Sequence, residues 1–217
     1  MTLLALPATE ILRGNKPILT LPGLTIASGE RVALLGPSGA GKSTLLDALY
    51  RLRPREIAWC PQQLGLVEPL SLFHNVYIGA LARHSLPYHL VNLARPWPNR
   101  YREIQELMTP LGLADRLESR VVHLSGGQRQ RTALGRALYR QQPTFLGDEP
   151  ITGIDPVQGP DILRRVLEAH TTSVVALHDA ELARTCCHRL IGLKAGRMLF
   201  DKAAGDVTDG DLNRLYR

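Results

Sequence analysis

The sequence predicts an α/β fold in which a parallel sheet is covered by helices on both faces. Short apolar segments alternate along the chain with longer segments of helical periodicity, which is the order expected of such a sheet. The strand-like segments are apolar throughout, as in strands that are buried on both faces. With 217 residues, of which 44% are hydrophobic and 21% charged, the chain is long enough for one well-buried domain with an attached subdomain.

Short strands and tight turns dominate the first 60 residues. Pro22-Gly23 and Ser28-Gly29 separate apolar runs, and such pairs mark turns between strands. A glycine-rich loop then precedes a helical pattern, and Pro61 ends the next apolar run. Strands are expected at residues 18–21, 24–26, 31–35 and 56–60, with a helix at 43–51.

The rest of the chain alternates helices with two more short strands. Residues 70–118 have a helical pattern, which we expect to be interrupted by a proline-rich loop containing Pro87, Pro96 and Pro98. A strong helix should follow from Leu124 to Arg140. The remaining expected elements are strands at 144–146 and 173–177, a hairpin around Ala195-Gly196, and a short helix near 209–216.

Charge, cysteines and hydropathy limit the classes of protein. No apolar run reaches the roughly 18 residues that a membrane helix needs, and the amino terminus lacks the features of a signal peptide. The net charge of +6 is spread along the chain, which favours a solvated basic surface over attraction to nucleic acid or an anionic membrane. Cys60, Cys186 and Cys187 lack ligand-like spacing and are expected to be core residues of a reduced, cytosolic protein, the last two in a helix.

A phosphate-binding loop is predicted between the strand at 31–35 and the helix at 43–51. Its residues match the pattern G-x-x-x-x-G-K-[ST]. Glycines let backbone N–H groups point at an anion, and the helix start adds positive charge. Lys42 should reach the β- and γ-phosphates, and the Ser43 hydroxyl should ligate Mg²⁺; an ordinary glycine turn is the alternative. The expected ATP-binding residues are Gly36, Pro37, Ser38, Gly39, Ala40, Gly41, Lys42, Ser43 and Thr44.

Two carboxylates follow the strand at 144–146. Ligands of open α/β sheets bind at the carboxyl ends of the strands, where Asp148 and Glu149 lie. Asp148 would hold the Mg²⁺, and Glu149 would orient or deprotonate the attacking water. An apolar-Asp-Glu run alone is often structural, but here it follows a phosphate loop.

A second anion-binding helix start is predicted at the sequence Leu124, Ser125, Gly126, Gly127 and Gln128. Ser125 would suit an ordinary N-cap, but a cap does not need two glycines, which favour close approach of the backbone to a ligand. A nucleotide has one γ-phosphate, so this second helix start is expected to serve the nucleotide of a partner subunit.

These motifs together resemble those of the ATP-binding cassette (ABC) family over nearly the whole chain. The resemblance implies a RecA-type parallel sheet of the phosphate-loop NTPase kind, an antiparallel β subdomain and an inserted α-helical subdomain. Within one ATPase domain, residues 1–65 and 121–217 would form the nucleotide-binding core with the β subdomain, and 66–120 the helical subdomain.

The resemblance also implies the activity and the partners. The chain would bind ATP and Mg²⁺, hydrolyse ATP, and pair with a second ATPase subunit as a head-to-tail homodimer. In such a dimer the signature residues, Leu124 to Gln128, cover the partner's ATP. The dimer would work at the cytoplasmic face of the inner membrane under an integral permease. A solute-binding protein would take part indirectly, and nucleic acid would not.

Further site residues come from the resemblance alone. Gln62 matches the glutamine that senses Mg²⁺ and the water and relays movement to the permease. Asp155 matches the loop that crosses the dimer interface. His178 matches the histidine that contacts the γ-phosphate and steadies Glu149. The expected catalytic residues are therefore Glu149, His178 and Gln62, and the expected Mg²⁺ ligands are Ser43, Gln62 and Asp148.

Two features depart from the family pattern. The stretch from Lys42 to Gln62 is shorter than usual, which implies a reduced antiparallel β subdomain. Relatives usually stack adenine on an aromatic residue upstream of the phosphate loop, but the first aromatic residue here is Tyr50. Arg13 lies at about the expected distance, and its guanidinium plane can stack on a base; a solvated arginine is the alternative.

Within the family, residues 68–81, a loop with Trp97, residues 108–113 and residues 212–217 resemble the ATPase subunit of bacterial phosphonate importers. This implies import of a phosphonate or related oxyanion; another importer, a lipoprotein-release ATPase or a degenerate nucleotide-binding module are alternatives. An ABC protein acting on nucleic acid or the ribosome is disfavoured, because those usually carry two cassettes or long insertions. Residues 66–120 should receive the permease's coupling helix. Phe73, Tyr77 and Trp97 are expected either to line that groove or to belong to the core.

Overall fold

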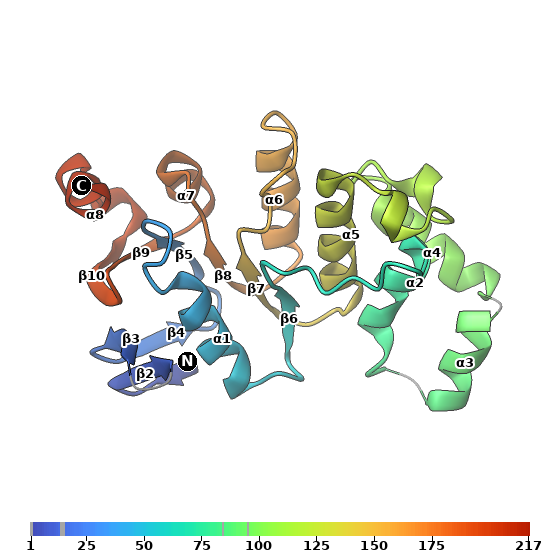
Figure 1. The fold of residues 1–217 in the computed structure, drawn as a ribbon, viewed down its shortest axis with the longest axis horizontal. Coiled ribbons are helices and arrows are strands. Elements are labelled where there is room, and N and C mark those ends of the chain that lie inside the picture. The colour runs from blue at the N-terminus through green and yellow to red at the C-terminus, as the bar shows by residue number, and fades with distance from the viewer. Residues whose placement is uncertain (1, 14–15, 84, 95) are drawn as a thin grey trace. The chain divides into compact units, whose positions relative to one another are not determined.

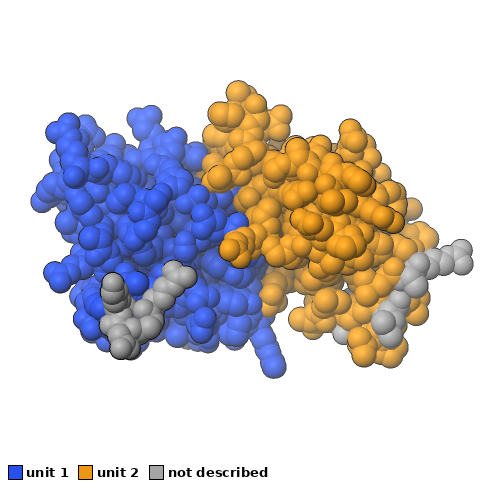
Figure 2. All heavy atoms as spheres, in the orientation of Figure 1, with its two compact units in different colours: residues 1–62, 143–150, 167–217 blue, residues 63–142, 151–166 orange. Residues whose placement is uncertain are grey.

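We describe a computed structural model of the chain, which covers residues 2–13, 16–83, 85–94 and 96–217 (Figure 1). The side chains of Arg13, Lys16, Leu90 and Ala94 lie outside this description. The chain forms two compact units (Figure 2). Unit 1 comprises residues 1–62, 143–150 and 167–217, and unit 2 comprises residues 63–142 and 151–166. The assignment of residues 66–120 to a helical subdomain stays a prediction.

Unit 1 contains an eight-stranded sheet with a parallel centre. Strands β6, β7, β8, β5 and β9 are neighbours in this order and all parallel, while β10 pairs antiparallel with β9, and β2 with β3. A separate antiparallel pair is formed by β1 and β4. The strands are β1 (Thr2–Leu6), β2 (Thr9–Arg13), β3 (Lys16–Leu21), β4 (Leu24–Ala27), β5 (Arg31–Leu35), β6 (Ile57–Cys60), β7 (Thr144–Asp148), β8 (Thr172–Ala176), β9 (Arg189–Lys194) and β10 (Arg197–Ala203).

The central strands are buried on both faces, which explains their continuous apolar sequences. Every residue of β7 and β8 is buried, as parallel strands between helices require. Helix α1 (Lys42–Leu52) packs Leu45, Leu46 and Leu49 into the same core. The expected α/β fold, with a mostly parallel core sheet and a small antiparallel sheet, is confirmed. This arrangement places the carboxyl ends of β5, β7 and β8 at one edge of the sheet.

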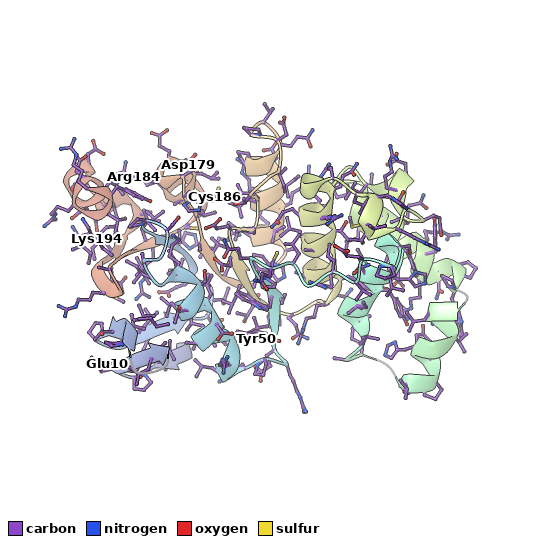
Figure 3. The ribbon with its side chains drawn as sticks, viewed as in Figure 1. Glu10, Tyr50, Asp179, Arg184, Cys186 and Lys194 are labelled. Atoms are coloured by element: carbon purple, nitrogen blue, oxygen red, sulfur yellow. The ribbon has the colours of Figure 1, made fainter. Side chains whose placement is uncertain are left out.

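The C-terminal helix of unit 1 is held by a buried carboxylate. Helix α8 (Asp209–Tyr216) begins with a capping box between Thr208 and Asp211. Lys202 Nζ donates to Asp211 at 2.7 Å, and Lys202 and Thr208 hold the pKa of Asp211 well below its usual range. Arg184, from α7 (Ala180–Cys186), donates to the carbonyl of Val207 at 2.6 Å, and Figure 3 shows Arg184 near α8.

Unit 2 is helical in its described part. Phe73 and Tyr77 are almost fully buried, with ring centroids 6.0 Å apart, so they belong to its core. Trp97 is 43% exposed and packs its ring on Tyr88. The helices are α2 (Leu72–Tyr77), η1 (Ile78–Ala80), α3 (Leu86–Ala94), α4 (Pro98–Met108), η2 (Ala114–Arg116), η3 (Val121–His123), α5 (Gly126–Tyr139) and, continuing into unit 1, α6 (Gly159–Glu168).

Two local expectations were wrong, and two strands were not expected at all. Pro87 and Pro98 do not lie in a loop but in the first turns of α3 and α4, where the missing N–H of proline costs little. Cys187 follows α7 in an extended conformation instead of lying inside it. The sequence also did not reveal β1 and β2, which are short and separated by Pro7. All three cysteines are free and buried, as expected.

Across the described residues, no helix combines the length and the apolar character needed to cross a bilayer.

Candidate functional site

The loop between β5 and α1 has a backbone that only glycine fits at its two ends. Gly36 has a φ of 146°, and a Cβ there would lie 2.1 Å from the carbonyl oxygen of Leu193. Gly41, at a φ of 105°, precedes α1, and no side chain caps the helix start. The loop therefore presents an uncapped helix N-terminus to a cavity of about 270 Å³, a site suited to anions. The cavity is lined by residues 38–44 together with Ile18, Gln62 and Glu149.

Lys42 is buried at the base of this loop. The residue is 5% exposed, and its Nζ donates to the carbonyl oxygens of Gly36 at 2.7 Å and Pro37 at 3.1 Å. Burial lowers the pKa of Lys42, while the negative charges of Glu149 and Asp148 oppose this shift. The geometry thus holds an ammonium group inside the loop, where phosphate oxygens can replace the carbonyls as its acceptors.

Asp148 ends β7 with a buried carboxylate that lacks a full set of partners. It is 3% exposed, and its Oδ1 has no hydrogen-bond partner among the described residues. The Ser43 hydroxyl donates to the carboxylate, and burial, followed by the charge of Glu149, raises the pKa of Asp148. An unpartnered carboxylate oxygen beside a hydroxyl is a donor set that suits Mg²⁺. These residues therefore fit the ion that the sequence led us to expect.

The missing partner of Asp148 Oδ1 has a measurable cost for the chain without ligands. We expect Asp148→Asn to raise the free energy of unfolding by about 1 kcal/mol in EDTA, because it removes a buried charge. The raised pKa means that the native state binds the proton more tightly than the unfolded chain. The gain is therefore full at neutral pH and shrinks as the pH falls through the native pKa. Urea unfolding measured from pH 7 downward, as far as the native chain stays folded, tests it; a gain that stays constant or grows over that whole acid range would contradict this explanation.

Glu149 adopts a left-handed backbone conformation at the edge of the same cavity. Its φ is 52°, and its N–H donates to the carbonyl oxygen of Ala176 at 3.2 Å. His178, two residues after β8, places its Nε2 2.6 Å from the Glu149 carboxylate. Non-glycine residues with positive φ are uncommon and often mark functional sites. A carboxylate that is fixed by a histidine at the mouth of an anion cavity can accept a proton from a bound water.

Helix α5 of unit 2 begins at the second glycine motif. Ser125 is its N-cap: the Gln128 N–H donates to Ser125 Oγ at 3.3 Å, and the Ser125 N–H donates to Gln128 Oε1 at 2.9 Å. A Cβ on Gly127 would lie 2.5 Å from the carbonyl oxygen of Gly153, whereas Gly126 has nothing within 4 Å. Gly127 is thus required by the loop of residues 151–158, and only Gly126 leaves open space for a ligand.

The two glycines should respond differently to substitution. Gly127→Ala is expected to lower the free energy of unfolding by about 1–3 kcal/mol, because its methyl group displaces the backbone of Gly153. Gly126→Ala should be neutral or stabilising by up to about 1 kcal/mol, since alanine favours the helix. Urea midpoints with unchanged slopes measure both effects. If both variants have the same stability, the contact with Gly153 does not explain why residue 127 is a glycine.

Asp155 lies in the same loop of unit 2. Its Oδ1 accepts hydrogen bonds from the N–H groups of Val157 at 2.9 Å and Gln158 at 3.3 Å, just before α6. The carboxylate therefore stabilises the local turn. Its expected place at a dimer interface, like that of the signature residues, stays a prediction.

Not every expected site residue can be placed. Lys42, Ser43, Gln62, Asp148, Glu149 and His178 gather in unit 1, around the phosphate loop. The side chain of Arg13, expected to stack on adenine, lies outside the described residues. The sequence did not point to a second cavity along α1, lined in part by Asp47 and Arg51. The only signal for it is that these two residues share one helix face with Ser43.

The fold and this site define a phosphate-loop nucleoside triphosphatase, because a parallel sheet presents the loop and the Asp-Glu pair at its carboxyl edge. The family model described as ABC transporter matches residues 20–152, and the chain belongs to this family. It is an ABC ATPase, which binds and hydrolyses ATP.

Relatives with similar sequences include importer subunits. The phosphonates import ATP-binding protein PhnC 1 of Pseudomonas syringae pv. syringae (strain B728a) is 37% identical, over 98% of this chain and 91% of its own. The phosphite import ATP-binding protein PxtA of Stutzerimonas stutzeri is 37% identical, over 94% of this chain and 82% of its own. A solved dimeric ATP-binding cassette in a post-hydrolysis state, bound to ADP and Pi, is 26% identical with a TM-score of 0.73, over 90% of this chain and 95% of its own.

Proposed function

We propose that this chain powers the import of a phosphonate or related oxyanion, as the ATPase subunit of a transporter with a separate membrane permease. The observation that carries the enzymatic part is the cavity in which Lys42, Ser43 and Glu149 meet at the phosphate loop. The chain would lie peripherally at the cytoplasmic face of the membrane.

The phosphate loop binds the triphosphate. Residues 38–44 donate backbone N–H groups, and Lys42 leaves the carbonyls of Gly36 and Pro37 to contact the β- and γ-phosphates. Ser43, Asp148 and Gln62 would hold Mg²⁺, which when bound neutralises charge on the phosphate oxygens. The unpartnered Oδ1 of Asp148 supports this assignment.

Glu149 and His178 then act on the attacking water. Glu149 accepts a hydrogen bond, and finally the proton, from a water in line with the γ-phosphate. His178 holds that carboxylate through the 2.6 Å contact and contacts the γ-phosphate. The bond from the water oxygen to the γ-phosphorus forms, the bond to the bridging oxygen of ADP breaks, and phosphate leaves.

Two copies of the chain would complete the sites together. The solved ATP-binding cassette with ADP and Pi is dimeric. In our proposal the phosphate loop of each chain binds that chain's nucleotide, so the helix start at Ser125 is free to contact the nucleotide of the partner. We place Ser125 and Gly126 over the partner's γ-phosphate, with Asp155 crossing between the subunits. The open space around Gly126 supports this assignment.

The permease would dock on residues 66–120. Within unit 2, a cavity of about 580 Å³ includes Pro96, Pro98, Tyr101 and Glu118 in its lining, and such a mixed surface suits an inserted helix from a partner. Gln62 lies at the end of unit 1, where the chain passes into unit 2. It would relay the state of the nucleotide to the docked permease.

The cargo is proposed from the relatives, which are named as importers of phosphonates and of phosphite. Deletion of the gene should abolish growth of its host with an alkylphosphonate or phosphite as the only phosphorus source, while growth on inorganic phosphate continues. The wild-type gene should restore growth and Glu149→Gln should not. Unchanged growth of the deletion strain on both sources, or a defect in lipoprotein sorting, would contradict the cargo while leaving the ATPase intact.

A further inference from the structure

Helix α8 ends beside the phosphate loop, although the two are far apart in the sequence. The helix packs on β9 (Figure 1), and Leu215 near its end is fully buried. β9 also adjoins the loop, because a Cβ on Gly36 would lie 2.1 Å from the carbonyl oxygen of Leu193. The next residue, Lys194, donates to the carbonyl of Arg214 in the last turn of α8. Two neighbouring residues of β9 therefore contact the loop and the helix.

Tyr216, in the last turn of the same helix, reaches the first residue of the loop. Although Tyr216 is 44% exposed, its hydroxyl oxygen accepts a hydrogen bond from the Gly36 N–H. Burial and the negative charge of Asp179 raise the pKa of Tyr216, while this hydrogen bond opposes the shift. The hydroxyl is therefore neutral near pH 7, and it lies near both the loop and the residue that follows His178.

Gly36 connects this hydroxyl to the ammonium group of Lys42. The N–H of Gly36 donates to Tyr216, and its carbonyl oxygen accepts from Lys42 Nζ at 2.7 Å. The φ of 146° is a conformation that glycine adopts freely and other residues rarely do. Because glycine loses more conformational freedom on folding than any other residue, a partner on each side of its Cα helps to keep it in place.

We propose that Tyr216 is a positioning residue of the ATPase, whose hydroxyl holds the first residue of the phosphate loop and thereby fixes the Lys42 ammonium for the incoming triphosphate. The inference rests on the proposed contact of Lys42 with the phosphates. Tyr216 does not touch the reacting atoms. It reduces the freedom that the loop loses when ATP binds, and such preorganisation increases affinity.

Tyr216→Phe tests the proposal, because phenylalanine keeps the ring and removes only the hydroxyl. The Kd for Mg-ATP should rise about three- to tenfold, as expected from the loss of one hydrogen bond. The kcat should stay within about twofold, since Glu149 and its water are untouched. The loss of affinity should be the same at pH 6.5 and pH 8.5, because the raised pKa keeps the hydroxyl neutral at both. Isothermal titration of the full-length chain with Mg-ATP and steady-state phosphate release measure the two quantities.

A double-mutant cycle distinguishes the positioning of Lys42 from a general loosening of unit 1. If the hydroxyl acts through the ammonium group, Tyr216→Phe should weaken Mg-ATP binding less than twofold in the Lys42→Ala chain. A change that only loosened α8 would weaken binding by the same factor with and without Lys42. Equal factors in the two chains would overturn the proposal.

Tyr50→Phe is the matched control, and Figure 3 labels this residue. Tyr50 belongs to the same unit, stacks its ring on Trp59 with 5.6 Å between centroids, and is absent from the described lining of the phosphate cavity. Its Phe variant should bind Mg-ATP like the wild type. Wild-type affinity in Tyr216→Phe, or an equal loss in Tyr50→Phe, would overturn the proposal. The proposed function fails separately, if Lys42→Ala itself binds Mg-ATP as tightly as the wild type.

Discussion

Glu149→Gln should reduce kcat for ATP at least about a hundredfold, with little change in the affinity for ATP. Glutamine preserves the shape of the side chain but cannot take a proton from water, and general bases contribute about 10²–10⁴-fold to rate. The Lys42 ammonium and the loop N–H groups, which bind the phosphates, are untouched by this change. Phosphate release and equilibrium binding of a fluorescent ATP analogue measure the two effects separately.

A substitution of His178 distinguishes the positioning of the Glu149 carboxylate from proton transfer by that carboxylate. His178→Gln keeps a donor near Glu149 and should lower kcat less than Glu149→Gln, because the carboxylate remains although its 2.6 Å contact is weakened. If Glu149→Gln hydrolyses ATP at more than a tenth of the wild-type rate, then Glu149 is not the base. The chemistry would then have to be assigned to another group.

Lys42→Ala should weaken ATP binding by about 10- to 100-fold, the second-largest effect we expect. Hydrogen bonds to charged groups contribute about 1.5–3 kcal/mol each, and the buried ammonium donates to two loop carbonyls that phosphate oxygens would replace. Isothermal titration with Mg-ATP measures the change.

Lys194→Ala is the matched control, because it removes a lysine of the same unit that donates instead to Arg214. It should leave ATP affinity within about threefold of the wild type. Because burial lowers the pKa of Lys42, ATP affinity should decline with rising pH before an ordinary lysine near 10.4 would lose its proton. Wild-type affinity in Lys42→Ala would remove the lysine from the proposed site.

Those parts of the fold that have local signals could be predicted from the sequence. The turn residues around β3, β4 and β5 and the final helix, α8, were expected close to their observed bounds. The phosphate loop and Asp148-Glu149 were expected at the strand ends because parallel strands carry ligands there. The structure places Lys42, Ser43 and Glu149 around one cavity.

Other features depend on contacts between distant residues, which leave no local pattern. Gly127 was expected to approach a ligand, and no local pattern showed that a side chain there would also collide with Gly153. The φ of 52° at Glu149 follows from the way β7 ends beside β8, and no propensity signals it. Pro87 was interpreted as part of a loop that interrupts the helices, although it lies in the first turn of α3. A proline alone is compatible with both positions, because it breaks a helix interior but is tolerated in a first turn.

The cap at Ser125 offers a clean way to test whether two chains share their sites. Asparagine and aspartate both cap helices about as well as serine, so Ser125→Asn and Ser125→Asp should fold alike. Aspartate adds a negative charge where we place the partner's γ-phosphate, and asparagine does not. The pair therefore changes the charge facing the nucleotide with little change in the helix.

Light scattering with size separation, applied to the Glu149→Gln chain with ATP, tests shared sites most directly. We expect the mass to double with ATP, to remain that of two chains when Ser125→Asn is added, and to fall to that of one chain when Ser125→Asp is added. A mass of one chain in Glu149→Gln despite bound ATP, or a dimer that is equally stable with Ser125→Asp, would contradict the shared-site account.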